Sequence, residues 1–106
     1  MSHQVRASHI LLMYAGSERS TASRTQAEAK EQIDDLKARI DGGEDLAALA
    51  KEHSDCPSGL RGGDLGPFGR GQMVKAFEDT TYAMAVGGVS DVVETPFGYH
   101  IIQRTG

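Results

Sequence analysis

The sequence predicts a single α+β domain. The first apolar run, residues 5–13, has the length and composition of a strand that is buried on both faces. Two amphipathic helical segments follow it, and the chain closes with two short apolar runs, at 91–95 and 99–104, joined by turn-forming residues. Because this last hairpin makes at least part of the sheet antiparallel, we assign the class α+β.

The two helical segments are predicted from caps and apolar stripes. Thr25 and Glu28 have the capping-box spacing, in which two side chains satisfy each other's backbone N–H groups. An apolar stripe at helical spacing follows and stops at Gly42 and Gly43; its members are Ala29, Ile33, Leu36 and Ile40. Asp45 is the expected N-cap of a second helix, whose inward residues are Leu46, Leu49 and Ala50.

The centre of the chain is rich in glycine and has no helical periodicity. Between residues 54 and 71 there is room for one short strand, at about 65–68. A third helix is predicted over 75–84, with Phe77 and Met84 facing inward. The expected order is β-α-α-β-α-β-β, in one domain over 1–106 with a short tail at 1–4.

Charge and composition limit the function classes. The net charge of -4, from 11 Lys and Arg against 15 Asp and Glu, argues against nucleic acid or an anionic membrane as the main partner. No apolar run approaches the roughly 18 residues of a membrane helix, and the first residues lack a secretory signal. We therefore expect a cytoplasmic protein that acts as a monomer.

Two histidines interrupt apolar strands. His9 lies inside the first predicted strand and His100 inside the last. Burying an imidazole without a hydrogen-bond partner costs about 1–3 kcal/mol, so each ring needs a partner. Two separate core histidines bonded to the backbone satisfy this requirement, and so does a pair of histidines in contact.

Cys56 lies in a loop between Asp55 and Pro57. Its thiol can be a small buried apolar group, a nucleophile beside a histidine, or a polarizable group that lines a pocket. The sequence has no Gly-x-Ser-x-Gly or oxyanion-hole motif to support a hydrolase. Since the histidines and the cysteine match no zinc-binding spacing, we expect no metal and no other cofactor.

Five segments stand in order and properly spaced along the chain: residues 7–11, 54–58, 62–66, 71–79 and 95–102. Together they resemble the parvulin family of peptidyl-prolyl cis/trans isomerases. The resemblance covers nearly the whole chain. It implies an FKBP-like parvulin fold, with a curved four-stranded antiparallel sheet flanked by helices. It also implies a rotamase that assists protein folding without a cofactor. Its substrates would be proline-containing peptides and unfolded or partly folded protein segments.

The same resemblance places the site residues. It sets His9 and His100 side by side beneath the active site, Cys56 and Asp55 at its rim, and Thr95 in its hydrogen-bond network. The substrate proline would lie in an apolar cup of Leu65, Met73 and Phe77, with Gln72, Val74 and Phe97 near the rim. An apolar cup favours the twisted amide, whose dipole is smaller than that of the planar one, so no covalent intermediate is needed.

One loop departs from part of the family. Phosphate-directed parvulins carry a basic cluster after the first strand. Here Met13 and Glu18 occupy two of those positions, and only Arg19 is cationic. Because phosphate affinity comes from several cationic contacts, we expect an isomerase without phosphate specificity. A non-catalytic proline-peptide-binding or chaperone module and a cysteine hydrolase remain as alternatives.

Overall fold

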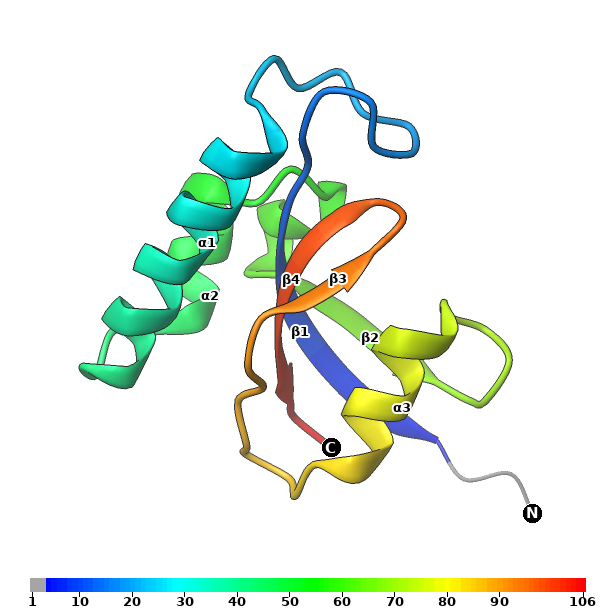
Figure 1. Ribbon diagram of the computed structural model, residues 1–106. Coiled ribbons are helices and arrows are strands. Elements are labelled where there is room, and N and C mark those ends of the chain that lie inside the picture. Colours follow the sequence, from blue (N-terminus) through cyan, green and yellow to red (C-terminus); the bar gives the residue numbers. More distant parts are fainter. Residues whose placement is uncertain (1–3) are drawn as a thin grey trace.

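The computed structural model describes residues 4–106, and its elements follow the predicted order (Figure 1). Four strands form one antiparallel sheet in the order β2-β1-β4-β3; they are β1 (Val5–Leu12), β2 (Asp64–Phe68), β3 (Val93–Thr95) and β4 (Gly98–Arg104). The helices are α1 (Gln26–Asp41), α2 (Leu46–His53) and α3 (Lys75–Ala83). Residues 1–3 of the predicted tail lie outside the described residues.

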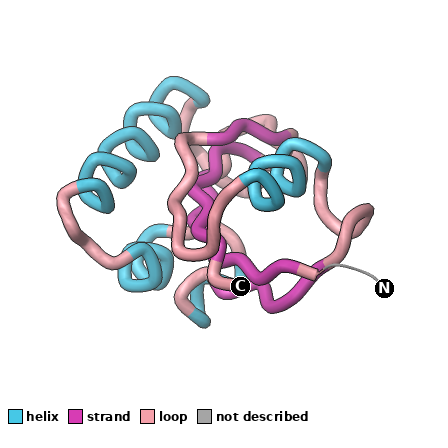
Figure 2. Tube along the Cα trace, turned by 90° about the horizontal axis from the view of Figure 1, so that it is seen from below, coloured by secondary structure: helices cyan, strands magenta, loops and turns pink. Residues whose placement is uncertain are grey.

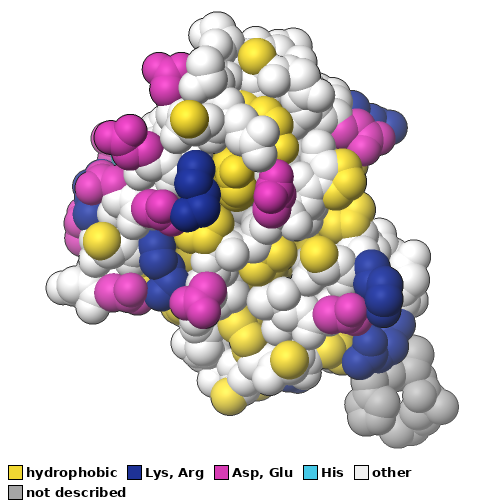
Figure 3. Space-filling model, in the orientation of Figure 1, with side chains coloured by type: hydrophobic (Ala, Val, Ile, Leu, Met, Phe, Trp, Pro, Cys, Tyr) yellow, Lys and Arg dark blue, Asp and Glu magenta, His cyan; other side chains and the backbone are white. Residues whose placement is uncertain are grey.

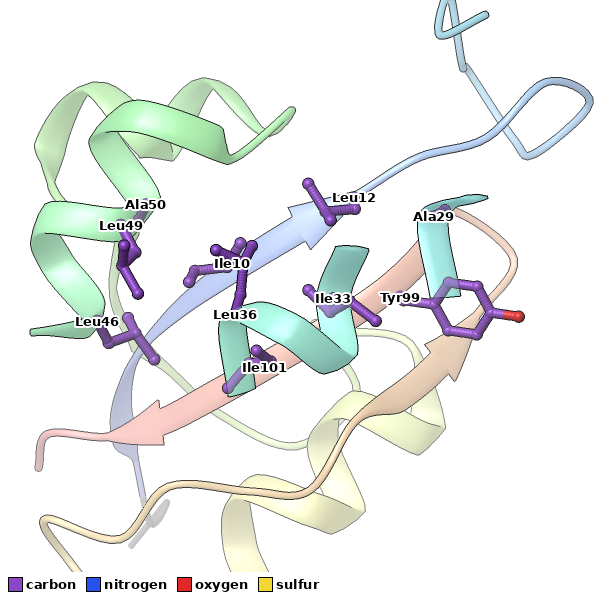
Figure 4. Close-up of a cluster of buried hydrophobic side chains, with 10 residues drawn as sticks. All are labelled: Ile10, Leu12, Ala29, Ile33, Leu36, Leu46, Leu49, Ala50, Tyr99 and Ile101. Carbon is purple, nitrogen blue, oxygen red and sulfur yellow. The ribbon is translucent and has the colours of Figure 1, made fainter. Parts of the chain in front are cut away.

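Helices cover both faces of the sheet, with α1 and α2 on one face and α3 on the other (Figures 1 and 2). Strand alternation produces the two layers, because successive side chains point to opposite faces. Ile10 and Leu12 of β1 pack toward α1 and α2 (Figure 4), whereas Val5 and Ala7 pack in the cluster that contains Phe77 of α3. The central strand is therefore buried on both faces, as its continuous apolar run predicts.

The capping box of α1 forms as predicted. The Thr25 hydroxyl accepts from the Glu28 N–H at 3.1 Å, and the Glu28 carboxylate accepts from the Thr25 N–H at 2.8 Å. Asp45 occupies the N-cap position of α2, but its side chain makes no capping hydrogen bond. The predicted position of that cap is thus correct, while the predicted role of its side chain is wrong.

Two segments differ from the sequence prediction. Residues Pro57–Arg61 form a 3₁₀ helix, η1, for which the sequence has no periodic signal. Proline fits the first turn of η1 because its fixed φ suits a helix start and its missing N–H has no helical partner there. Strand β3 begins at Val93 instead of residue 91, because the chain before it pairs irregularly with β4; the Ser90 N–H, for example, donates to the Ile102 carbonyl at 2.7 Å.

Gly63 brings the start of β2 against the middle of β1. The His9 N–H donates to the Gly63 carbonyl at 3.0 Å. Gly63 has φ of +83°, and a Cβ atom there would lie only 2.2 Å from the His9 carbonyl oxygen. Only glycine accepts both the backbone conformation and the close approach. This contact fixes the backbone that carries the His9 ring.

The surface carries acidic groups on the side where α1 lies (Figure 3). A hollow there is lined by residues of α1 that include Glu28, Glu31, Asp34 and Asp35. Some of this charge is balanced on the helix itself, since Lys30 pairs with Asp34 at 2.6 Å. Among residues 4–106, no helix is both long and apolar enough to cross a membrane.

Candidate active site

A cavity of about 480 Å³ opens on the α3 side of the sheet. Its floor is formed by His9 and Leu11 of β1 and by His100 of β4. One wall comes from α3, from β2 and from the loop between them, and consists of Leu65, Gln72, Met73, Val74 and Phe77. The opposite rim consists of Met13, Arg19, Cys56, Pro57 and Phe97. The structure thus brings nine of the eleven predicted site residues to one cavity: His9, Cys56, Leu65, Gln72, Met73, Val74, Phe77, Phe97 and His100.

Strand geometry explains why these residues form the floor. His9 and Leu11 are two residues apart on β1, so both side chains point to the face that α3 covers. Leu11 pairs in register with His100 of β4. His9 pairs with Ile102, the next residue of β4 whose side chain points to the same face. Leu11 was not predicted as a site residue, although its place two residues after His9 is a sequence signal that identifies it.

The two histidines contact each other. Their Nδ1 atoms are 3.0 Å apart, and both rings are 4% exposed. The Phe77 ring packs against both in T-shaped geometry, with ring centroids 5.3 Å from His9 and 5.5 Å from His100. Of the two arrangements that the sequence left open, the structure has the pair, in which each imidazole is the other's partner.

Thr95 links the histidine pair to the backbone. Its hydroxyl oxygen accepts from the Phe97 N–H at 3.2 Å and lies 2.6 Å from His100 Nε2. If the hydroxyl donates to that nitrogen, His100 donates from Nδ1 to His9, and the His9 Nε2–H remains without a described partner. In the opposite assignment the Thr95 hydroxyl proton would also have no acceptor among residues 4–106, so we assign the first.

Burial keeps both histidines neutral at pH 7. It lowers the pKa of His9 to about 4, because the charged imidazolium loses its hydration inside the protein. The pKa of His100 is lowered to about 3 by the same burial, with a further contribution from the charge of His9. A neutral pair places no net positive charge under the cavity.

Cys56 and Asp55 have different surroundings although they are neighbours. The Cys56 thiol lines the cavity and accepts a hydrogen bond from the Ser58 hydroxyl at 3.1 Å. The Asp55 carboxylate accepts from the Met13 N–H at 2.8 Å and from Arg24 Nη1 at 2.5 Å. Asp55 lines a second cavity, of about 620 Å³, that adjoins the first. Asp55 and Thr95 are thus the two predicted site residues that do not line the apolar cavity.

Pro57 and Arg24 were not predicted from the sequence as site residues. Pro57 follows Cys56 directly, so its place on the rim could have been inferred from that neighbour. Arg24 has no comparable signal, because only the folded chain brings it to Asp55, 31 residues away. Within residues 4–106, no group of three or more His, Cys, Asp or Glu side chains is placed to hold a metal ion.

Comparison with known proteins shows which family has this fold. The family model described as the PPIC-type PPIase domain matches residues 1–106. The peptidyl-prolyl cis-trans isomerase Pin1 of Digitalis lanata is 45% identical, over 99% of this chain and 98% of its own length. The foldase PrsA of Geobacillus kaustophilus is 48% identical, over 96% of this chain and 31% of its own.

A solved structure shows the same arrangement. The peptidyl-prolyl isomerase ESS1 from Candida albicans matches this chain with a TM-score of 0.91 and 40% identity, over 97% of this chain and 63% of that one. The parvulin fold that the five sequence segments predicted is therefore confirmed. The chain belongs to the parvulin, or PPIC-type, family and is a peptidyl-prolyl cis/trans isomerase.

Proposed function

We propose that this isomerase turns the X-Pro bond by non-covalent catalysis inside the apolar cavity, and that its substrates need no phosphate. The observation that supports this most is the cavity itself, whose apolar wall faces two neutral histidines. Proline-containing peptides and unfolded or partly folded segments would be bound there. The net charge of -4 supports a partner other than nucleic acid. We further propose that the protein acts as a monomer in the cytoplasm.

The energetics make a covalent step unnecessary. Amide resonance sets a barrier of about 18–20 kcal/mol to rotation about the peptide bond. An acceleration of about four powers of ten needs only about 5–6 kcal/mol of selective transition-state stabilisation. In the twisted state the amide has lost resonance and is less polar. A cup of Leu65, Met73 and Phe77 stabilises that state more than the planar one.

The other residues act around this cup. Cys56 sets the electric field at the rim, where the carbonyl before proline would lie, and does not attack it. Gln72 and Phe97 contact the peptide on either side of the proline. Thr95 holds the histidine floor through its bond to His100, and Asp55 braces the rim through Arg24 and the Met13 N–H.

Replacing Cys56 separates an electrostatic role from a nucleophilic one. We expect Cys56→Asp to keep kcat/KM within about tenfold of the native value, because a carboxylate is a polar group of similar size at the same place. Cys56→Ala should lower kcat/KM by more than the aspartate variant without abolishing it. All three proteins are compared on one X-Pro peptide. A folded but inactive aspartate variant, together with a substrate-derived mass adduct on the native thiol, would establish covalent catalysis instead.

The loop after β1 predicts little preference for phosphate. Arg24 is already paired with Asp55, which leaves Arg19 beside Glu18 as the cation available at the rim. We expect kcat/KM for a phosphoserine-proline peptide to stay within about tenfold of the serine-proline value. Met13→Lys combined with Glu18→Arg should raise this ratio. A native preference of about 100-fold, which corresponds to about 2.7 kcal/mol, contradicts the proposal.

A further inference from the structure

The loop between β2 and α3 supplies much of the cavity wall. Gln72, Met73 and Val74 all line the cavity, yet none of them belongs to a helix or strand. Met73 and Val74 are partly buried against the cluster that contains Phe77. A wall made by irregular backbone binds a rigid proline ring well only if other contacts hold that backbone in place.

Glu78 supplies such a contact. It follows Phe77 in the first turn of α3 and is only 8% exposed, which is unusual for a carboxylate. Its Oε1 atom accepts from the Gly71 N–H at 2.5 Å, and its Oε2 atom lies 3.4 Å from Arg70 Nη1. Gly71 has φ of +88°, a conformation that glycine adopts at little cost. The carboxylate therefore ties the loop to the helix that carries Phe77.

Two further contacts fix the same loop. The Arg70 guanidinium lies over the ring of Tyr82, 4.2 Å from its centroid, on the next turn of α3. The Gln72 side chain folds back on the loop, where its Oε1 atom accepts from the Gly69 N–H at 2.9 Å. With Glu78 at the centre, the loop is attached to α3 at Gly71 and Arg70. Met73 therefore lies between the anchored part of the loop, residues 70–72, and the start of α3, which carries Phe77.

We infer that Glu78 is a positioning residue for the isomerase, which holds Met73 and Gln72 against the substrate proline through its bond to the Gly71 N–H. The inference rests on the isomerase function and on the cup proposed above. Glu78 does not line the cavity and does not touch the substrate. Its effect on catalysis passes through the loop, and it depends on the reach of the side chain more than on its charge.

Two variants separate reach from charge. Glu78→Gln keeps the side-chain length and an oxygen that can accept from the Gly71 N–H, but it has no charge. Glu78→Asp keeps the charge and is one methylene shorter, so it cannot reach Gly71 in the same backbone. Asp79→Asn is the matched control, because Asp79 is the next residue on α3 and also lies near Arg70, at 4.0 Å.

We expect Glu78→Gln and Asp79→Asn to keep kcat/KM within about threefold of the native value, and Glu78→Asp to lower it by about tenfold. The loss should come mainly from a higher KM, because the misplaced wall binds proline less well. A role in stability alone would lower the folded fraction, and with it kcat, at an unchanged KM. The methyl resonance of Met73, in protein labelled at the methionine methyl groups, should shift in Glu78→Asp and not in Glu78→Gln.

The inference is overturned if Glu78→Asp has native kcat/KM, if it loses activity with an unchanged Met73 resonance, or if Glu78→Gln loses as much as Glu78→Asp. If Glu78→Asp fails to fold, Glu78→Gln alone decides. Native activity together with a slowly exchanging Gly71 amide proton supports the inference. Loss of activity together with fast exchange of that proton opposes it. The native protein is assayed alongside. Its inactivity would count against the isomerase function, whereas unaffected variants of an active enzyme count only against the role of Glu78.

Discussion

Replacing Met73 and Phe77 together by alanine is expected to lower kcat/KM for X-Pro peptides by about a hundredfold, the largest effect on activity that we predict. These two side chains belong to the apolar wall beside the histidine floor. Removing them lets water into the cavity and takes away the apolar contacts that favour the less polar twisted amide. A hundredfold loss corresponds to about 2.7 kcal/mol, the contribution of about one large buried apolar side chain.

Stability has to be separated from activity in this experiment. Phe77 is 3% exposed and packs against Phe68, so truncation to alanine costs about 3–5 kcal/mol of folding free energy. The variant Met73→Ala with Phe77→Leu keeps most of the buried volume and should still lose more activity than Met73→Ala alone. Met84→Ala is the control, because Met84 packs in the same cluster but does not line the cavity. Native kcat/KM in a folded double variant, shown by circular dichroism, contradicts the proposed cup.

Acid is expected to destabilise the fold steeply below pH 6.5. The folded-state pKa of His9 is about 4 and that of His100 about 3, whereas an unfolded histidine titrates near 6.5. Between these values the unfolded chain binds protons that the folded protein excludes. The stability that the two neutral histidines contribute is therefore fully present above about pH 6.5, and it is lost as the pH falls toward 4. Each histidine adds a slope of up to about 1.4 kcal/mol per pH unit.

Urea unfolding at a series of pH values measures this slope. The variant with His9→Leu and His100→Leu removes both titrating groups, so its free energy of unfolding should depend less on pH over the same interval. A free energy of unfolding for the native protein that stays constant between pH 4.5 and 6.5 would mean that the folded pair binds protons as readily as the unfolded chain does, which contradicts the lowered pKa values.

The elements that the sequence predicts well are those with a local physical cause. The start of α1 depends on Thr25 and Glu28, three residues apart, and its inward face on the regular spacing of Ile33 and Leu36. The last strand pair depends on a tight turn between two short apolar runs. In each case the determinant lies within one element, where periodicity and capping act directly.

The features that could not be predicted from local patterns depend on long-range contacts. His9 and His100 are 91 residues apart, and the residues alone left open whether they meet; the resemblance to a known family placed them together. Asp55 was predicted at the rim of the active site, but no local pattern indicates its bonds to Arg24 and to the Met13 N–H, which hold its carboxylate beside the adjoining cavity. Glu78 lies in the segment 71–79 that resembles the family, yet the positioning role that we infer for it rests on its buried hydrogen bond from the Gly71 N–H, which only the fold shows.

Exchange spectroscopy on a simple X-Pro peptide, recorded by NMR with substoichiometric protein, tests the central claim most directly. Uncatalysed exchange takes tens to hundreds of seconds, so cis and trans resonances of the free peptide stay separate and sharp. We predict exchange cross-peaks and line broadening between the two forms when the protein is added, and an exchange rate lower by about a hundredfold when Met73 and Phe77 are replaced. Spectra that are identical with and without the native protein, under conditions in which a titration detects binding, would contradict the account and leave a proline-peptide-binding module.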